Sequence, residues 1–106
     1  MKIEFRLFDE FVQTLTREQG RIVVVRVDTQ IEERDKIQPK VIITAKHPAE
    51  SDIYYYELSL GEFTPGHYAS CSVVIRQELE EQRKSFFRRL KEAGFTVRKG
   101  IYTNNK

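Results

Sequence analysis

A long helical repeat near the C-terminus limits the fold classes open to this chain. From about Ala69 onward, apolar residues recur at helical spacing and form one stripe, which consists of Ile75, Leu79, Phe86, Leu90 and Ala93. Gly94 followed by the apolar Phe95 is typical of a left-handed helix end whose next residue packs back on the last turn. The repeat therefore predicts one helix of about 25 residues with a single buried face.

Alternating and β-branched segments predict a sheet. The apolar residues Ile3, Phe5 and Leu7 alternate with charged ones, so a half-buried strand is expected over residues 2–7. The run 21–28 is rich in β-branched residues, which are typical of strands. Further strands are expected over residues 40–46, 53–60 and 95–102. The three consecutive strands in the middle of the chain suggest an antiparallel meander.

A shorter helix is expected between the first two strands, over residues 10–19, with Asp9 as its N-cap and Gly20 as its end. Its apolar residues recur at helical spacing, and they are Phe8, Phe11, Val12 and Leu15. The charged stretch 29–40 has no sustained period. We therefore expect it to be an exposed loop that has room for one helical turn.

These elements give the order β-α-β-β-β-α-β, which predicts a single α+β domain over residues 1–102 and a polar tail at 103–106. Because both helices offer one apolar stripe and most strands one apolar face, we expect a largely antiparallel sheet with both helices on one side. The opposite face should then display basic, acidic and tyrosine side chains. They are Arg6, Arg26, Lys46, Tyr55, Arg98 and Tyr102, together with Glu4, Asp28 and Glu57.

The composition is that of an ordinary globular domain. The 106 residues are 40% hydrophobic and 32% charged, which is typical of one folded domain with a well-hydrated surface. The longest apolar run, Ile22–Val25, is far shorter than a membrane span, and no apolar segment of a secretion signal follows the first residues. Cys71 is the single cysteine, so no disulfide can form within the chain. We expect a cytoplasmic protein without a membrane partner.

No group of residues has the spacing of a catalytic or metal-binding motif. His47 and His67 have no Cys, His or carboxylate partner at a metal-ligand spacing, and Cys71 is expected to be a small buried residue at the start of the long helix. The acidic residues between 28 and 35 lack the central glycine and final glutamate of a calcium loop, so we interpret them as a hydrated charge run. We expect no catalytic residue, no metal site and no cofactor.

The element order α-β-β-β-α-β from residue 10 onward resembles the core of the restriction-endonuclease-like nucleases. That family uses an Asp and a Glu-x-Lys on adjacent strands to hold a metal and activate water. The nearest matches here are Thr44-Ala45-Lys46, where threonine replaces the carboxylate, and Glu57-Leu58-Ser59, where serine replaces the lysine. The resemblance therefore implies this fold without an intact catalytic motif.

Basic residues concentrate in the last quarter of the chain, where residues 82–106 carry eight Lys and Arg against one Asp or Glu. The long helix presents three of them opposite its apolar stripe, namely Lys84, Arg88 and Lys91. Arg98 and Lys99 extend this surface if the last strand lies alongside the helix. Such cations neutralise phosphates, although cations near a helix C-terminus also complement the helix dipole.

Two aromatic residues accompany this basic surface. Tyr55 is expected on the outer face of the sheet, where its ring is able to stack on an exposed base, and Phe87 is either part of the core or an anchor for a protein partner. The leading hypothesis is a small non-catalytic binding module that contacts nucleic acid through Lys84, Arg88, Lys91, Arg98, Lys99 and Tyr55. The alternative is a protein-interaction or homodimerising domain that uses an edge strand, the outer sheet face or Phe87.

Overall fold

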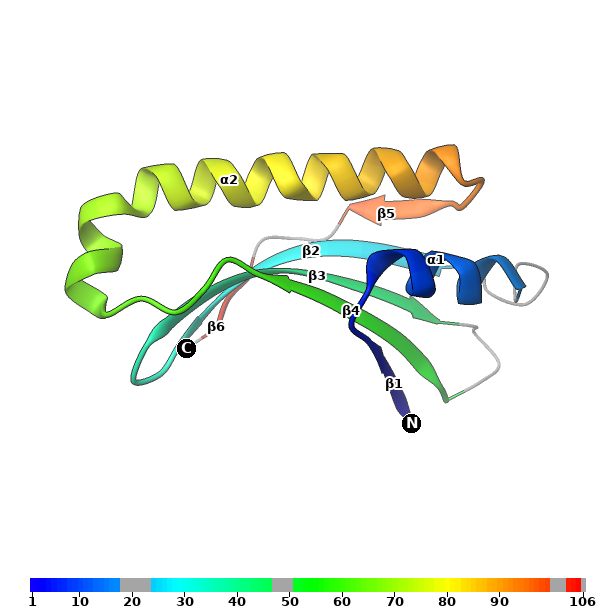
Figure 1. Ribbon diagram of the computed structural model, residues 1–106, viewed down its shortest axis with the longest axis horizontal. Helices are drawn as coiled ribbons and strands as arrows, with labels where there is room; N and C mark the ends of the chain where they lie inside the picture. Colours follow the sequence, from blue (N-terminus) through cyan, green and yellow to red (C-terminus); the bar gives the residue numbers. More distant parts are fainter. Residues whose placement is uncertain (18–23, 47–50, 100–102, 106) are drawn as a thin grey trace.

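The alternating segments form one mixed sheet, and the two helical repeats form the helices that cover it (Figure 1). The structure is a computed structural model that describes residues 1–17, 24–46, 51–99 and 103–105. The helices are α1 (Phe8–Arg17) and α2 (Pro65–Glu92), and the strands are β1 (Lys2–Phe5), β2 (Val24–Glu33), β3 (Ile37–Lys46), β4 (Ile53–Ser59), β5 (Val97–Lys99) and β6 (Thr103–Asn105). Up to and including β5, the elements follow the expected order, so the α+β class is confirmed.

Neighbouring strands lie in the order β1-β4-β3-β2-β5, and β6 also pairs with β2. The central strands β2, β3 and β4 form the expected antiparallel meander. The remaining strands run parallel to their neighbours, β1 to β4 and both β5 and β6 to β2. The sheet is therefore antiparallel at its centre and parallel toward both edges.

Both helices pack on the same face of the sheet, which we call the inner face. Val25, Val27 and Ile43 point to this side and are fully buried, with α2 against β2 and β3 and α1 against β1 and β4. The rest of the core consists of Phe8, Phe11, Leu15, Ile31, Ile37, Val41, Ala45, Tyr56, Leu79, Phe86, Leu90 and Phe95. Figure 1 shows the strands bending away from α2 toward both ends of the sheet, so the opposite or outer face is concave. No described helix combines the length and the apolar character that crossing a membrane requires.

The stretch expected to be an exposed loop, residues 29–40, is the end of a long hairpin, so this prediction was wrong. β2 and β3 pair over their whole length, and the chain turns at residues 34–36. Thr29, Ile31 and Ile37 point to the inner face and are buried. Thr29 and Pro39 occupy inner positions of the two strands, and the charged turn at 34–36 separates them, so the sequence shows no sustained apolar period of two.

Pro39 lies inside β3, although proline cannot donate a hydrogen bond to a strand ladder. Its carbonyl oxygen accepts a hydrogen bond of 2.9 Å from the backbone N–H of Leu60, so its backbone polar atoms face the β4 side. Because β4 ends at Ser59, the missing N–H of Pro39 lies beyond the last rung of the ladder between the two strands. β4 therefore requires no hydrogen bond from a backbone N–H at the position of Pro39.

α1 begins two residues earlier than expected, at Phe8, so Asp9 lies in its first turn and is not the N-cap that we predicted. The backbone carbonyl of Leu7 already accepts a hydrogen bond of 3.1 Å from the N–H of Phe11. In the first turn the Asp9 carboxylate still favours the helix, because it lies near the positive end of the helix dipole. The predicted stop at Gly20 lies outside the described residues.

α2 begins at Pro65, earlier than the apolar stripe indicates, because Thr64 caps it. The hydroxyl oxygen of Thr64 accepts a hydrogen bond of 3.3 Å from the His67 N–H, and Pro65 occupies a first-turn position that suits its fixed φ. Cys71 departs from helical geometry, with φ of −129° and ψ of 17°, and it marks a kink. Its thiol is half-buried rather than fully buried and lies 3.1 Å from the carbonyl oxygen of His67.

The C-terminal end of α2 is the one that the sequence predicts. Gly94 has a φ of +97°, in the left-handed region that favours glycine. The N–H of the buried Phe95 donates a hydrogen bond of 3.1 Å to the carbonyl oxygen of Leu90, so Phe95 packs back on the last turn. This turn reverses the chain and brings β5 alongside β2.

Two expected strands are shorter in the structure. β1 ends at Phe5, so Arg6 follows the strand and does not lie on the outer face. The strand predicted over 95–102 is described only as β5, residues 97–99, and residues 100–102, including Tyr102, lie outside the described part. Residues 103–105, which we expected in a polar tail, pair with β2 as β6.

Replacing Gly94 with alanine should destabilise the domain by about 1 kcal/mol, because alanine is strained at a φ of +97°. Gly66 is the matched control, since it lies in α2 with open space around its missing Cβ. Gly66→Ala should be neutral or slightly stabilising. Chemical denaturation measures both changes, and equal stability of Gly94→Ala and the parent would contradict the left-handed cap.

Lys40 should stabilise the hairpin in a pH-dependent way. Its Nζ lies 3.0 Å from Glu32 on β2 and 3.4 Å from Glu57 on β4, and the hydrogen bond from Lys40 lowers the pKa of the Glu32 carboxyl. The stabilisation from Glu32 is therefore present above the ordinary glutamate pKa, about 4.3, and is lost as the pH falls through the lower pKa of the folded state. Lys40→Met should lower Tm near pH 7, and the gap from the parent should shrink toward about pH 3.

Thermal denaturation between these pH values tests this dependence. Lys36→Met is the matched control, because Lys36 is exposed in the turn between β2 and β3. It should change Tm little at any pH. A Tm gap between the parent and Lys40→Met that stays constant from pH 7 to pH 3 would show that the Lys40 pairs do not stabilise the hairpin.

Candidate nucleic-acid interface

The outward side of α2 carries a line of exposed cations, Lys84, Arg88 and Lys91, which we call the α2 cationic stripe. They lie opposite the face through which Leu79 and Leu90 enter the core, so burying the apolar face directs the three cations to solvent. The helical spacing alone predicted this arrangement. At 1.5 Å of rise per residue the three side chains span about 10 Å along the helix axis.

A hollow of about 570 Å³ lies along the same side of α2. It is lined by the stripe together with Arg83, Phe87 and Glu92. Phe87 is half-buried, and the Nζ of Lys91 lies 5.8 Å from the centre of its ring, within cation–π range. The hollow therefore joins positive charge to one aromatic ring that the helix holds in place.

The stripe cations are only weakly neutralised. The Nε of Arg88 lies 3.8 Å from a carboxylate oxygen of Glu92, and both side chains are 69% exposed, so this pair is long and hydrated. Lys84 makes no ion pair within the part of the chain that the structure describes. These charges are therefore available to an anionic ligand.

Two other cations of α2 have structural roles. The guanidinium of Arg89 lies 4.3 Å from the ring centre of Phe8 and 3.7 Å from the Asp9 carboxylate, so it joins α2 to α1. Arg83 is buried and binds Glu80 through two of its nitrogen atoms. Arg89 binds partners on another helix, whereas Glu80 lies three residues before Arg83 in α2 itself, and the helical spacing had already placed both arginines outside the stripe.

Arg98 lies on the outer face of the sheet and not beside the stripe. Its register partner is Arg26 on β2, whereas the neighbouring Val25 and Val27 point to the inner face. Lys99 pairs through its backbone with Val27, and its side chain is outside what the structure describes. The five residues of the sequence hypothesis whose side chains are described therefore fall on two separate surfaces.

Tyr55 lies on the outer face as predicted, but its ring is already engaged. Its hydroxyl donates a hydrogen bond of 2.9 Å to Glu57, and the Nζ of Lys2 lies 4.0 Å from the ring centre. Burial, followed by the Glu57 carboxylate, raises the pKa of the Tyr55 hydroxyl. One ring face is thus covered by an ammonium group, and stacking on a base would require Lys2 to move.

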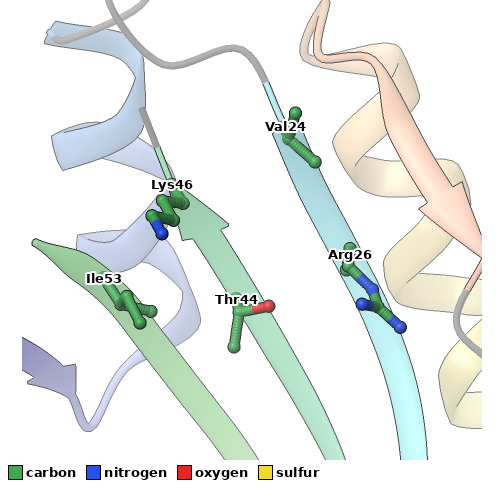
Figure 2. A pocket seen from close by; sticks show the side chains of 5 residues that line it. All are labelled: Val24, Arg26, Thr44, Lys46 and Ile53. Carbon is green, nitrogen blue, oxygen red and sulfur yellow. The ribbon is translucent and has the colours of Figure 1, made fainter. Parts of the chain in front are cut away.

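A second hollow, of about 400 Å³, lies on the outer face (Figure 2). It is lined by Val24 and Arg26 from β2, Thr44 and Lys46 from β3, and Ile53 from β4. Two cations therefore stand beside an apolar floor. The alternating pattern of the strands predicted both cations on this face, but the hollow itself depends on the register of three strands, which the sequence does not reveal.

The acidic and sulfur-containing side chains of the described residues either pair with cations of the fold or lie too far apart to form a metal site. The described residues include no group of three or more His, Cys, Asp and Glu side chains that could hold a metal ion. Glu32 binds Lys40 and, at 2.8 Å, Arg34, while Asp28 lies 3.4 Å from Arg26. His47 lies outside the described residues.

Comparison of the chain with protein-family models, with curated proteins and with solved structures finds no match.

Proposed function

We propose that this domain is a non-catalytic module that binds nucleic acid through the α2 cationic stripe. The observation that carries the proposal is the hollow that Lys84, Arg88 and Lys91 line together with the half-buried ring of Phe87. Cations neutralise phosphates and release condensed counterions, and an aromatic ring packs against bases of any sequence. The hollow offers both kinds of contact within three turns of one helix.

The competing explanation for these cations is that they only complement the dipole at the C-terminal end of α2. Interactions of that kind are worth about 0.3 to 1 kcal/mol each and act within the last turn. Lys84 lies two turns before the end of α2, beyond their range. The stripe also differs from Arg83 and Arg89, whose charges are committed to partners within the fold.

Two positions that correspond to the nuclease motif support the proposal that this module is non-catalytic. Thr44 stands where that motif has a carboxylate, and Ser59 stands where it has a lysine. Thr44 lines the hollow on the outer face together with the apolar residues Val24 and Ile53. This surface suits contact with a ligand better than activation of water.

A second candidate function, contact with a protein partner or a second copy, is favoured by Val73 and Val74. These adjacent apolar residues of α2 are 68% and 66% exposed. Sedimentation velocity over a range of concentrations tests for self-association, which Val73→Ser with Val74→Ser should weaken. A chain that stays monomeric throughout would count against the homodimer.

Neutralising the stripe should weaken nucleic-acid binding and reduce its dependence on salt. The triple variant Lys84→Gln, Arg88→Gln and Lys91→Gln keeps residues that favour helix but removes three positive charges. If each cation contacts one phosphate of a single strand, the slope of log K against log salt should fall by about 2. Fluorescence anisotropy of labelled single-stranded DNA, RNA and duplex DNA at several salt concentrations measures both effects.

The matched control removes three exposed cations elsewhere, through Arg6→Gln, Arg17→Gln and Lys36→Gln. It changes the net charge equally but leaves the stripe intact. It should keep most of the affinity and the slope of the parent. Equal losses in the two triple variants would show that net charge, and not the stripe, drives binding, and no binding at low salt would disprove the proposed function.

A further inference from the structure

The side of α2 that bears the hollow with Phe87 lies toward the β5 edge of the sheet. Arg89, on the other side of the helix, contacts Phe8 and Asp9 of α1, and α1 covers β1 and β4 at the far edge. Phe87 is two residues away and therefore points away from α1. α2 also contacts β5 directly, and Figure 1 shows β5 beneath the C-terminal half of the helix.

The outer side of the same edge is also cationic. Arg98 on β5 lies opposite Arg26 on β2, and Lys46 lies one register row further along β3. Neither Arg98 nor Lys46 makes an ion pair with another described residue. A ligand that leaves the α2 hollow and passes around β5 would therefore meet Arg98, then Arg26, and then Lys46.

The floor between these cations is apolar and lies on the concave face of the sheet. Val24, Thr44 and Ile53 form it, and Figure 2 shows their side chains on three adjacent strands beside Arg26 and Lys46. The volume of the outer-face hollow, about 400 Å³, is in the range of small-ligand sites. A base is able to pack on this floor while its flanking phosphates meet the surrounding cations.

The two surfaces can share one ligand only if the ligand is flexible. The domain measures 46 × 27 × 23 Å between Cα atoms, whereas duplex DNA has a persistence length of about 500 Å. A duplex that lies against α2 cannot turn around an edge of this size to reach the opposite face of the sheet. A single strand has no such restriction.

We infer that the preferred ligand is single-stranded nucleic acid, which runs from the α2 hollow around β5 into the outer-face hollow, where Arg26, Lys46 and Arg98 contact its phosphates. The inference rests on the proposed function of the α2 cationic stripe. It adds the outer face as a second contact surface of the same strand, a surface that a duplex bound to α2 cannot reach.

The test is the double variant Lys46→Gln and Arg98→Gln, both of which are exposed positions without ion pairs in the described residues. With a labelled single strand of about 16 nucleotides, the upper range of known footprints, affinity should fall and the salt slope should decrease by about 1. Binding of a duplex of the same length should be unchanged, because it contacts α2 alone. Titration at high protein concentration should give one strand per protein.

Arg6→Gln with Lys36→Gln is the charge-matched control and should behave as the parent. If the stripe variant loses affinity for the single strand while the Lys46 and Arg98 variant does not, the outer face is not a contact surface and the inference fails, although the proposed function stands. Two strands per protein, or an equal effect of the double variant on duplex, would also overturn it. Absence of all binding by the parent protein would instead remove the proposed function.

Discussion

The orientation of the α2 cationic stripe depends on a cluster of aromatic rings between the helices and the sheet. Phe8 of α1, Tyr56 of β4 and Phe86 of α2 meet with ring centres 4.8 to 5.8 Å apart. Arg89 covers this cluster from the outside, with its guanidinium over Phe8. Because one contact fixes three elements, it sets the rotation of α2 about its own axis and so determines which of its cations face solvent.

The same cluster explains which parts of the fold the sequence was able to predict. The helical stripe that contains Phe86 and the alternating strand that contains Tyr56 each have a clear period, and both elements were predicted with the right buried face. The hairpin at residues 29–40 was missed because Thr29 interrupts the apolar side of β2, because the charged turn at 34–36 breaks the period, and because Pro39 argues against a central strand. Only the pairing with β4 reveals that Pro39 lies beyond the last rung of the ladder.

The candidate site was predictable to the extent that it lies on one element. Lys84, Arg88 and Lys91 share a helix face, and helix geometry alone places them together. Arg98 belongs to a strand whose neighbours are not evident from the sequence, and pairing with Arg26 transfers it to the opposite face of the sheet. Arg83 and Arg89 carry the same charge as the stripe but lie on other sides of the helix, and only the tertiary contacts of Arg89 with α1 show that it serves the fold.

The two terminal strands in the sheet order also have a consequence for assembly. β1 has four residues, of which Lys2 and Glu4 are charged, and the described part of β5 has three, of which Arg98 and Lys99 are charged. Short charged strands are poor templates for the addition of another strand, so fibril-like growth from either side of the sheet is disfavoured. The short charged strands at the two ends of the sheet order thereby hinder the edge-to-edge pairing by which sheets with a large uncovered face usually aggregate.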